Sequence, residues 1–149
     1  MIEPSSKQKE YLRLIETHEL CFLTGAAGTG KTYIACSSAL SFLERGKVDK
    51  IIITRPLVAT EEVGFLPGTL EEKIDPYMAP IVEILSEIYD KKAIKRMIED
   101  GVIQSAPLAF MRGSTFKDAF VILDEAQNTT KSQISMFLTR FGRGSKGCI

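Results

Sequence analysis

The run Gly25-Ala26-Ala27-Gly28-Thr29-Gly30-Lys31-Thr32 has residue types and a spacing that point directly to chemistry. It matches the pattern G-x-x-x-x-G-K-(S/T), in which glycines let the backbone turn tightly so that successive N–H groups face a phosphate chain. Lys31 would bring a full positive charge to the β- and γ-phosphates, and Thr32 would offer its hydroxyl to Mg²⁺. The run therefore predicts a phosphate loop for ATP and Mg²⁺.

A pair of carboxylates, Asp124 and Glu125, directly follows the apolar segment Ala119–Leu123. Phosphoryl transfer needs positioning, neutralised charge and an oriented nucleophile. Asp124 would hold Mg²⁺, through water or through Thr32, and Glu125 would polarise the attacking water. The other interpretation, an ordinary acidic pair at the surface end of a strand, is disfavoured by the phosphate loop upstream.

These residues need a scaffold, and the pattern of apolar residues predicts one in which strands alternate with helices. Because the strands are almost continuously apolar, we expect an α/β fold with a mostly parallel sheet covered on both faces, which binds ligands at the carboxyl ends of its strands. Expected strands are 20–24, 50–54, part of 102–110, and Ala119–Leu123. Expected helices are 6–17 (capped by Ser5 or Ser6), 31–45, 77–89, 92–99, and one from Thr129 or Thr130 to 141, with a long functional connection over 57–75.

Length and composition describe one domain, 1–149, with a sizeable core and an ordinary charged surface. Hydrophobic residues make up 44% and charged residues 26% of the 149 residues, and 19 Lys and Arg balance 19 Asp and Glu. This balance neither supports nor excludes a nucleic acid as partner. We expect no membrane span, because no apolar run approaches the roughly 20 residues that one needs. Three widely spaced cysteines predict free thiols in a reducing cytoplasm.

Several motifs together resemble the PhoH family of bacterial and phage phosphate-starvation-inducible ATPases. Besides the phosphate loop and Asp124-Glu125-Ala126-Gln127-Asn128, they are Thr54-Arg55-Pro56, Gly64-Phe65-Leu66-Pro67-Gly68, Glu72-Lys73-Ile74-Asp75-Pro76-Tyr77 and Phe110-Met111-Arg112-Gly113. The resemblance runs from about residue 8 to residue 146, and the second and third of these four runs are the specific ones. It implies a P-loop NTPase in the cytoplasm of a bacterial or phage-infected cell.

The PhoH family is in turn similar to the first motor domain of superfamily 1 helicases. This likeness implies that Gln8 contacts the adenine, and that Gln127 and Gln133 couple the nucleotide to strand binding. It implies nucleic-acid backbone contacts for Thr54, Arg55 and Pro56. Arg112 either touches RNA or caps a strand, and single-stranded RNA or DNA would be the partner.

Two arginines, Arg140 and Arg143, end the last expected helix. They either complement the helix dipole or act as a finger that reaches the γ-phosphate of a neighbouring subunit. No arginine lies within the loop or next to Asp124 and Glu125 in sequence, so we expect any such finger to come from another subunit of a homo-oligomer.

The carboxyl terminus departs from the family pattern. In the family, a strand and a Gly-Asp-x-x-Gln segment follow the last helix, whereas this sequence stops at Gly147-Cys148-Ile149, where that strand should begin. We therefore expect a fragment or truncated chain that lacks a γ-phosphate sensor, with an unpaired sheet edge that favours association.

Three functions compete at this point. An ATPase acting on RNA, as a helicase-like motor or remodeller, is the leading hypothesis. A nucleotide-switched oligomerising module that binds a partner without significant turnover is the second. A small-molecule kinase is the third, and Glu125 argues against it because a kinase needs an acceptor hydroxyl rather than an activated water.

Overall fold

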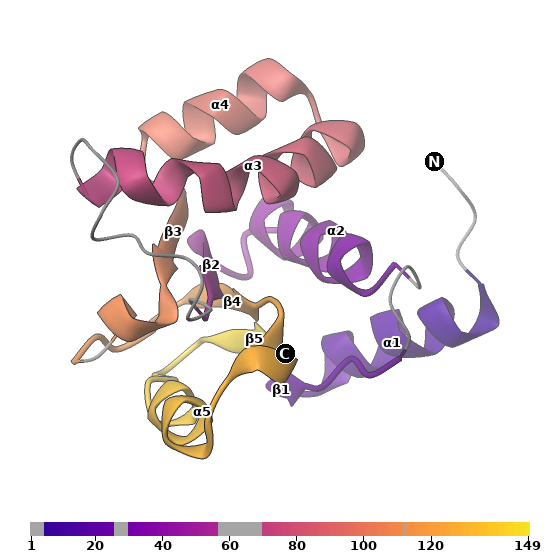
Figure 1. Ribbon diagram of the computed structural model, residues 1–149. Helices are drawn as coiled ribbons and strands as arrows, with labels where there is room; N and C mark the ends of the chain where they lie inside the picture. The colour runs from indigo at the N-terminus through magenta and orange to yellow at the C-terminus, as the bar shows by residue number, and fades with distance from the viewer. Residues whose placement is uncertain (1–4, 26–29, 57–69, 112) are drawn as a thin grey trace.

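The chain forms a five-stranded, all-parallel sheet in the strand order β1-β5-β4-β2-β3. The computed structural model describes residues 5–25, 30–56, 70–111 and 113–149. The strands are β1 (Leu20–Cys21), β2 (Lys50–Arg55), β3 (Ile103–Pro107), β4 (Ala119–Leu123) and β5 (Lys146–Cys148). This is the α/β fold with a parallel sheet that the alternating pattern predicts (Figure 1).

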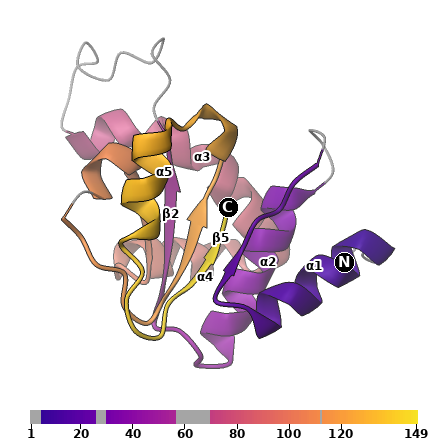
Figure 2. The ribbon, with the colours of Figure 1, turned by 90° about the horizontal axis from the view of Figure 1, so that it is seen from below.

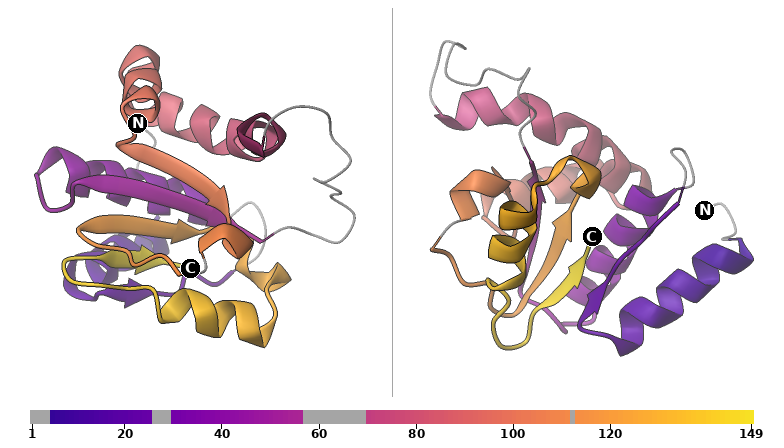
Figure 3. Two further views of the ribbon diagram at one scale, coloured as in Figure 1. Left: turned by 90° about the vertical axis from the view of Figure 1, so that its left-hand side faces the viewer. Right: turned by 60° about the horizontal axis from the view of Figure 1, so that its bottom comes forward.

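Helices lie on both faces of the sheet and bury two separate cores, as Figure 3 shows. The helices are α1 (Ser6–Thr17), α2 (Lys31–Glu44), α3 (Leu70–Ile88), α4 (Lys91–Glu99) and α5 (Lys131–Leu138), with short 3-10 helices η2 (Leu108–Met111) and η3 (Ala126–Asn128). Alternate residues of a strand face opposite cores: Ile51 and Ile53 pack in the α1–α4 core, whereas Ile52 packs in the α5 and η2 core.

Side chains cap three helices; the caps of α1 and α5 lie at one of the two residues predicted for each, whereas no cap is predicted for α4. Ser5 and Gln8 form a capping box at α1, and Thr130 and Gln133 form another at α5. Asp90 caps α4 by accepting a hydrogen bond from the Ala93 N–H. Each cap pairs N–H groups that the first turn of a helix leaves without an internal partner. No helix in the described ranges has the length and apolar character needed to cross a membrane.

Some element ends differ from the prediction. β1 has two residues rather than five, β2 includes Arg55, and α5 ends three residues earlier, at Leu138. α3 begins at Leu70, so part of the predicted 57–75 connection is helical, and 57–69 lies outside the described residues. A strand ends where pairing with its neighbour ends. β1 pairs with β5 through Leu20 and Cys21 alone, and the Leu23 N–H then donates to the Ile149 carbonyl.

The expectation of a missing strand and an open edge beside β4 is wrong. Lys146–Cys148 already form β5, which lies between β1 and β4 and pairs with both. Gly147 faces Leu20 on one side and Val121 on the other. A segment of three residues is too short for its sequence to predict a strand. In the structure it forms one because β1 and β4 pair with its backbone N–H and C=O groups on both sides.

Gly147 lets Phe141 pack against the sheet, and this gives a test of the fold. A Cβ at Gly147 would lie 2.5 Å from Phe141 Cζ and 2.9 Å from Leu20 Cδ1. The Phe141 ring cannot yield easily because it also packs on Phe116 and Phe137, with centroids 5.5 and 5.2 Å away. We expect Gly147→Ala to lower the free energy of unfolding by about 1–3 kcal/mol, measured by urea denaturation.

The matched control is Ser135→Ala on the exposed side of α5, which should change stability by less than about 0.5 kcal/mol. If Gly147→Ala is as stable as the control variant, the close packing of Phe141 on β5 is refuted.

Candidate nucleotide-binding site

The parallel sheet brings the predicted chemical groups to one edge. Gly25 follows β1, Arg55 ends β2 and Asp124 follows β4, so all three lie at the carboxyl ends of their strands. Figure 2 shows the arrows of β2, β4 and β5 pointing to this edge. Ligands of open α/β sheets bind here, and the contacts below identify which of the predicted residues meet.

The phosphate loop ends in a backbone conformation that requires glycine. Gly30 is the N-cap of α2 and adopts φ 80° and ψ 21°, in the left-handed region. A Cβ there would lie 2.9 Å from Gln8 Nε2. Lys31 begins α2, and its ammonium donates a hydrogen bond to the Gly25 carbonyl across the loop. Lys31 and the positive end of α2 thus both face this edge, whereas the predicted loop residues Ala26, Ala27, Gly28 and Thr29 lie outside the described part of the chain.

Helix α1 is fastened to the start of the phosphate loop. Tyr11 Oη donates a 2.7 Å hydrogen bond to the carbonyl of Thr24, the residue before Gly25. Gln8 lies beside Gly30, so the structure brings it to the loop, while its predicted contact with adenine stays a prediction. The role of Tyr11 could not be predicted from the sequence, because an aromatic residue on the apolar face of a helix has the pattern of a core residue whether or not its hydroxyl has a partner.

Asp124 joins the phosphate loop to β4. Thr32 Oγ1 donates to Asp124 Oδ1 at 3.1 Å, and the Asp124 side chain is 11% exposed. A threonine hydroxyl and a carboxylate at this spacing are hard oxygen donors, and Mg²⁺ in nucleotide sites takes one or two such protein ligands together with phosphate oxygens and water. The residues present therefore fit the metal predicted for Thr32 and Asp124.

The second oxygen of Asp124 is bound by Arg55. Arg55 Nη2 lies 2.8 Å from Asp124 Oδ2, and the Arg55 side chain is 27% exposed. No arginine lies next to the acidic pair in sequence, but β2 lies next to β4 in the sheet, so Arg55 meets Asp124 across the strands. The neighbours Thr54 and Pro56 are buried, and their predicted nucleic-acid contacts stay predictions.

Glu125 is held in an unusual backbone conformation. It adopts φ 56° and ψ 39°, which is uncommon for a residue with a side chain. Such strain tends to persist at functional sites, where it aims a side chain. Gln127 Nε2 donates a hydrogen bond to Glu125 Oε2, so the structure joins these two predicted residues. Gln133 instead closes the capping box of α5, and its coupling role stays a prediction.

The structure separates Arg140 and Arg143 from the site. Their carbonyls accept hydrogen bonds from the Phe116 and Asp118 N–H groups, just before β4 begins, whereas Asp124 follows the end of β4. The five residues of β4 span about 16 Å. The arginine in contact with Asp124, among the described residues, is Arg55 rather than either of these, and their trans role stays a prediction. Arg112 lies outside the described residues.

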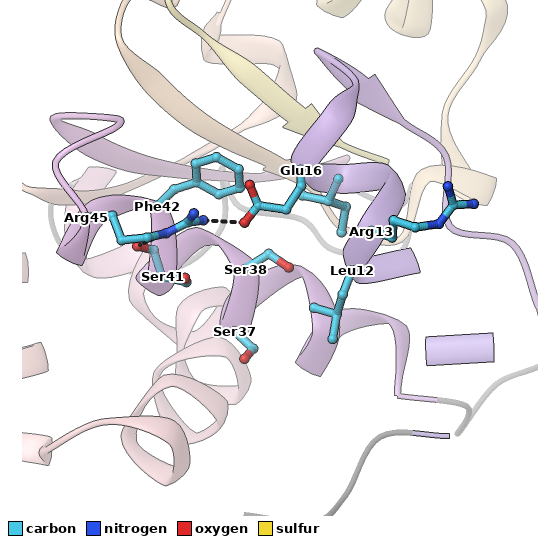
Figure 4. Close-up of a pocket in the computed structure, with 9 residues that line it drawn as sticks. Leu12, Arg13, Glu16, Ser37, Ser38, Ser41, Phe42 and Arg45 are labelled. Atoms are coloured by element: carbon cyan, nitrogen blue, oxygen red, sulfur yellow. Dashed lines mark hydrogen bonds and ion pairs between the residues drawn. The ribbon is translucent and has the colours of Figure 1, made fainter. Parts of the chain in front are cut away.

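A cavity between α1 and α2 is separate from this site. It has a volume of about 330 Å³ and is lined by Leu12, Arg13, Ile15, Glu16, Ser37, Ser38, Ser41, Phe42 and Arg45. Figure 4 shows Arg45 reaching Glu16 across its opening, an ion pair of 2.5 Å. None of the predicted site residues lines it, so the nucleotide site is defined by contacts at the sheet edge and not by this cavity.

Comparison with known proteins identifies a family and several relatives of this chain. The family model described as "PhoH-like protein" matches residues 1–149. The chain is 53% identical over 140 residues to a PhoH-like protein of Mycobacterium tuberculosis (strain ATCC 25618 / H37Rv), covering 93% of this chain and 40% of that protein. It is 52% identical over 140 residues to one of Bacillus subtilis (strain 168), covering 93% and 44%, and 46% identical over 138 residues to Protein PhoH of Escherichia coli (strain K12), covering 91% and 39%. The chain thus spans about two fifths of the length of these relatives.

The three thiols lie in the core behind the site. Burial, together with the negative charge of Asp124, raises the pKa of Cys36 to about 12. Burial likewise raises the pKa of Cys148 to about 12 and raises that of Cys21. A raised pKa keeps a thiol protonated, so none of the three supplies a thiolate near neutral pH.

We expect these thiols to resist alkylation in the folded protein. At pH 8, iodoacetamide should label the native chain far more slowly than the urea-unfolded chain, whose thiols have a pKa of about 8.5. Mass spectrometry of the labelled protein measures both rates. Rapid modification of Cys36 in the native state would show that its burial behind Asp124 is wrong.

Proposed function

Because the chain belongs to the PhoH-like family, whose fold is that of the P-loop NTPases, we propose that it binds ATP with Mg²⁺ and hydrolyses it. One observation supports this above all: the Thr32 hydroxyl and the Asp124 carboxylate, 92 residues apart in sequence, meet at 3.1 Å at the carboxyl edge of the sheet. The relatives are much longer than this chain, so the activity of the whole protein is part of the proposal.

Binding rests on charge and backbone donors at the start of α2. The N–H groups at this helix end and the ammonium of Lys31 would hold the triphosphate, and the hydrogen bond of Lys31 to Gly25 would be exchanged for phosphate oxygens. Thr32 and Asp124 would hold Mg²⁺, which supplies positive charge to the β- and γ-phosphates. Gln8, fixed by its capping box beside Gly30, would face the base end of the nucleotide.

Glu125 would orient the attacking water. Its carboxylate would accept a proton as the water oxygen forms a bond to the γ-phosphorus and the bond to the β–γ bridging oxygen breaks, leaving ADP and inorganic phosphate. The hydrogen bond from Gln127 holds the Glu125 carboxylate in place. A kinase would need a second substrate at this position, and Glu125 is better suited to water.

We further propose that the ATPase works with single-stranded RNA in the cytoplasm, as a motor or remodeller. Two features support a surface that binds single-stranded nucleic acid at the same edge of the sheet. Phe110, in η2 just after β3, is 45% exposed and offers a face on which a base can stack. Gln127 touches Glu125, which would connect hydrolysis to a bound strand. An oligomer, which a single motor domain needs for unwinding, remains a prediction.

A pair of variants separates binding from hydrolysis. Glu125→Gln should keep ATP·Mg²⁺ binding, because the amide has nearly the same shape, and should lower turnover by at least about 100-fold because it cannot accept the proton. Lys31→Ala should instead weaken ATP binding severely. Calorimetric titration and phosphate release measure the two effects. Near-wild-type turnover in Glu125→Gln would assign the base elsewhere, and unchanged affinity in Lys31→Ala would refute the phosphate site.

The role of a nucleic acid is tested by measuring the rate of ATP turnover with and without single-stranded RNA, single-stranded DNA or heparin. We expect RNA to stimulate ATP turnover, more at about 50 mM than at about 200 mM salt because phosphate contacts release counterions. Heparin controls for polyanion effects. A rate of ATP turnover that stays low, and that neither RNA nor DNA changes at either salt concentration, would favour the nucleotide-switched module instead.

A further inference from the structure

We propose that Arg55 binds the γ-phosphate of the ATP held by its own subunit. Before ATP binds, Arg55 forms its ion pair with Asp124 instead. The inference rests on the proposed ATP site. It adds to that site Arg55, which the resemblance to helicases assigns to a nucleic-acid contact. It also removes the need for an arginine from a neighbouring subunit.

The first support is the way in which one carboxylate is shared. Asp124 Oδ1 accepts from Thr32 at 3.1 Å, and Asp124 Oδ2 accepts from Arg55 at 2.8 Å. Thr32 and Asp124 are the residues that would hold Mg²⁺, and in nucleotide sites of this kind the metal also binds the γ-phosphate. The Arg55 guanidinium is therefore separated from the γ-phosphate position by little more than one carboxylate.

The second support is a spare donor on Arg55. Its Nε is buried and has no hydrogen-bond partner among the described residues, although its Nη2 binds Asp124. Buried donors are nearly always paired, and an exception calls for an explanation. A guanidinium keeps its charge and presents a planar fork that fits phosphate oxygens through two parallel hydrogen bonds. The unpaired donor is accounted for if a phosphate is the second partner.

The third support is that the backbone around Arg55 is fixed, so a side-chain movement suffices. β2 and β4 are paired up to Thr54 and Leu123, and the Asp124 N–H donates to the Thr54 carbonyl at 2.9 Å. If Asp124 held Mg²⁺, the metal would neutralise much of the negative charge of the carboxylate, so the ion pair would weaken and the added positive charge would repel Arg55. The γ-phosphate oxygens nearby carry the negative charge that Arg55 then needs.

This placement gives Arg55 a role in the reaction. As the bond to the bridging oxygen breaks and the bond to water forms, charge gathers on the equatorial oxygens of the γ-phosphoryl group, and Arg55 would stabilise it. An arginine supplied in this way is worth about 10³–10⁵ in rate in related NTPases. In the nucleotide-free protein the ion pair with Asp124 prevents Arg55 from being buried without a counter-charge.

The first test compares affinities for Mg²⁺·ADP and for a non-hydrolysable imido analogue of Mg²⁺·ATP, measured by calorimetry. Arg55→Met should reduce the preference for the triphosphate at least about tenfold, because one charged bidentate contact is lost. Its ADP affinity should be unchanged or higher, since Asp124 no longer has to release an arginine. The control is Arg13→Met, an exposed position on α1 away from the site, which should behave as wild type.

The second test distinguishes an arginine within the subunit from one in a neighbour. Arg55→Met binds nucleotide but lacks the arginine, and Lys31→Ala keeps the arginine but lacks the phosphate site. If Arg55 acts within its own subunit, a mixture of the two variants stays as inactive as each alone at every protein concentration. Recovery of turnover in the mixture would overturn the proposal.

Further outcomes decide the remaining alternatives. An unchanged triphosphate preference in Arg55→Met would overturn the proposal and leave Arg55 as a neutralising partner of Asp124. If RNA affinity alone falls, Arg55 is a strand contact and the proposal is again wrong. Arg55→Lys, which keeps the charge for folding but not the fork, should show an intermediate loss of preference. Failure of the wild-type chain to bind either nucleotide would overturn the proposed function as well, whereas failure of the Arg55 tests alone would leave it standing.

Discussion

The Asp124 carboxylate is shared between two side chains that come from different parts of the chain. Thr32 reaches one oxygen from the first turn of α2, and Arg55 reaches the other from the end of β2. With 11% of its side chain exposed, Asp124 would be costly to place here without such partners. The contact fixes how far α2 stands from β4, and it sets the distance from the phosphate loop to Glu125. The rest of the site depends on this one arrangement.

The sheet makes that arrangement possible because all its strands run the same way. A parallel order of β1-β5-β4-β2-β3 places the ends of β1, β2 and β4 along one edge, although β5 separates β1 from β4. The apolar residues of β4 are buried on both faces, in two cores formed with α2 and with α5. A strand packed on both sides has little freedom to shift, so the position of Asp124 is as rigid as the core.

Helix α1 is held at its middle and at its carboxyl end, and the first of these contacts joins it to the residue before the phosphate loop. Tyr11 binds Thr24 at 2.7 Å, while Lys146 from β5 donates to the carbonyls of Ile15 and Glu16 at 2.5 and 3.1 Å. The Lys146 ammonium also lies 4.6 Å from the centre of the Phe42 ring, and burial lowers its pKa. A cation suits this position because the carbonyls at a helix end carry partial negative charge. β5 thus contributes to the sheet and to the anchoring of α1.

Local patterns by themselves determined most of the elements and predicted the residues of the candidate site. The phosphate-loop motif, the apolar run before Asp124 and the helix caps act over a few residues, so the sequence alone identified the first two and narrowed the caps to Ser5 or Ser6 and to Thr129 or Thr130. Tertiary structure decided which distant groups meet. The sequence could not show that Arg55 lies on Asp124, because strand order depends on the packing of the whole sheet, and it could not show β5, because three residues form a strand only between two neighbours. Contacts between distant residues are set by the balance of burial over the entire chain, which no short segment encodes.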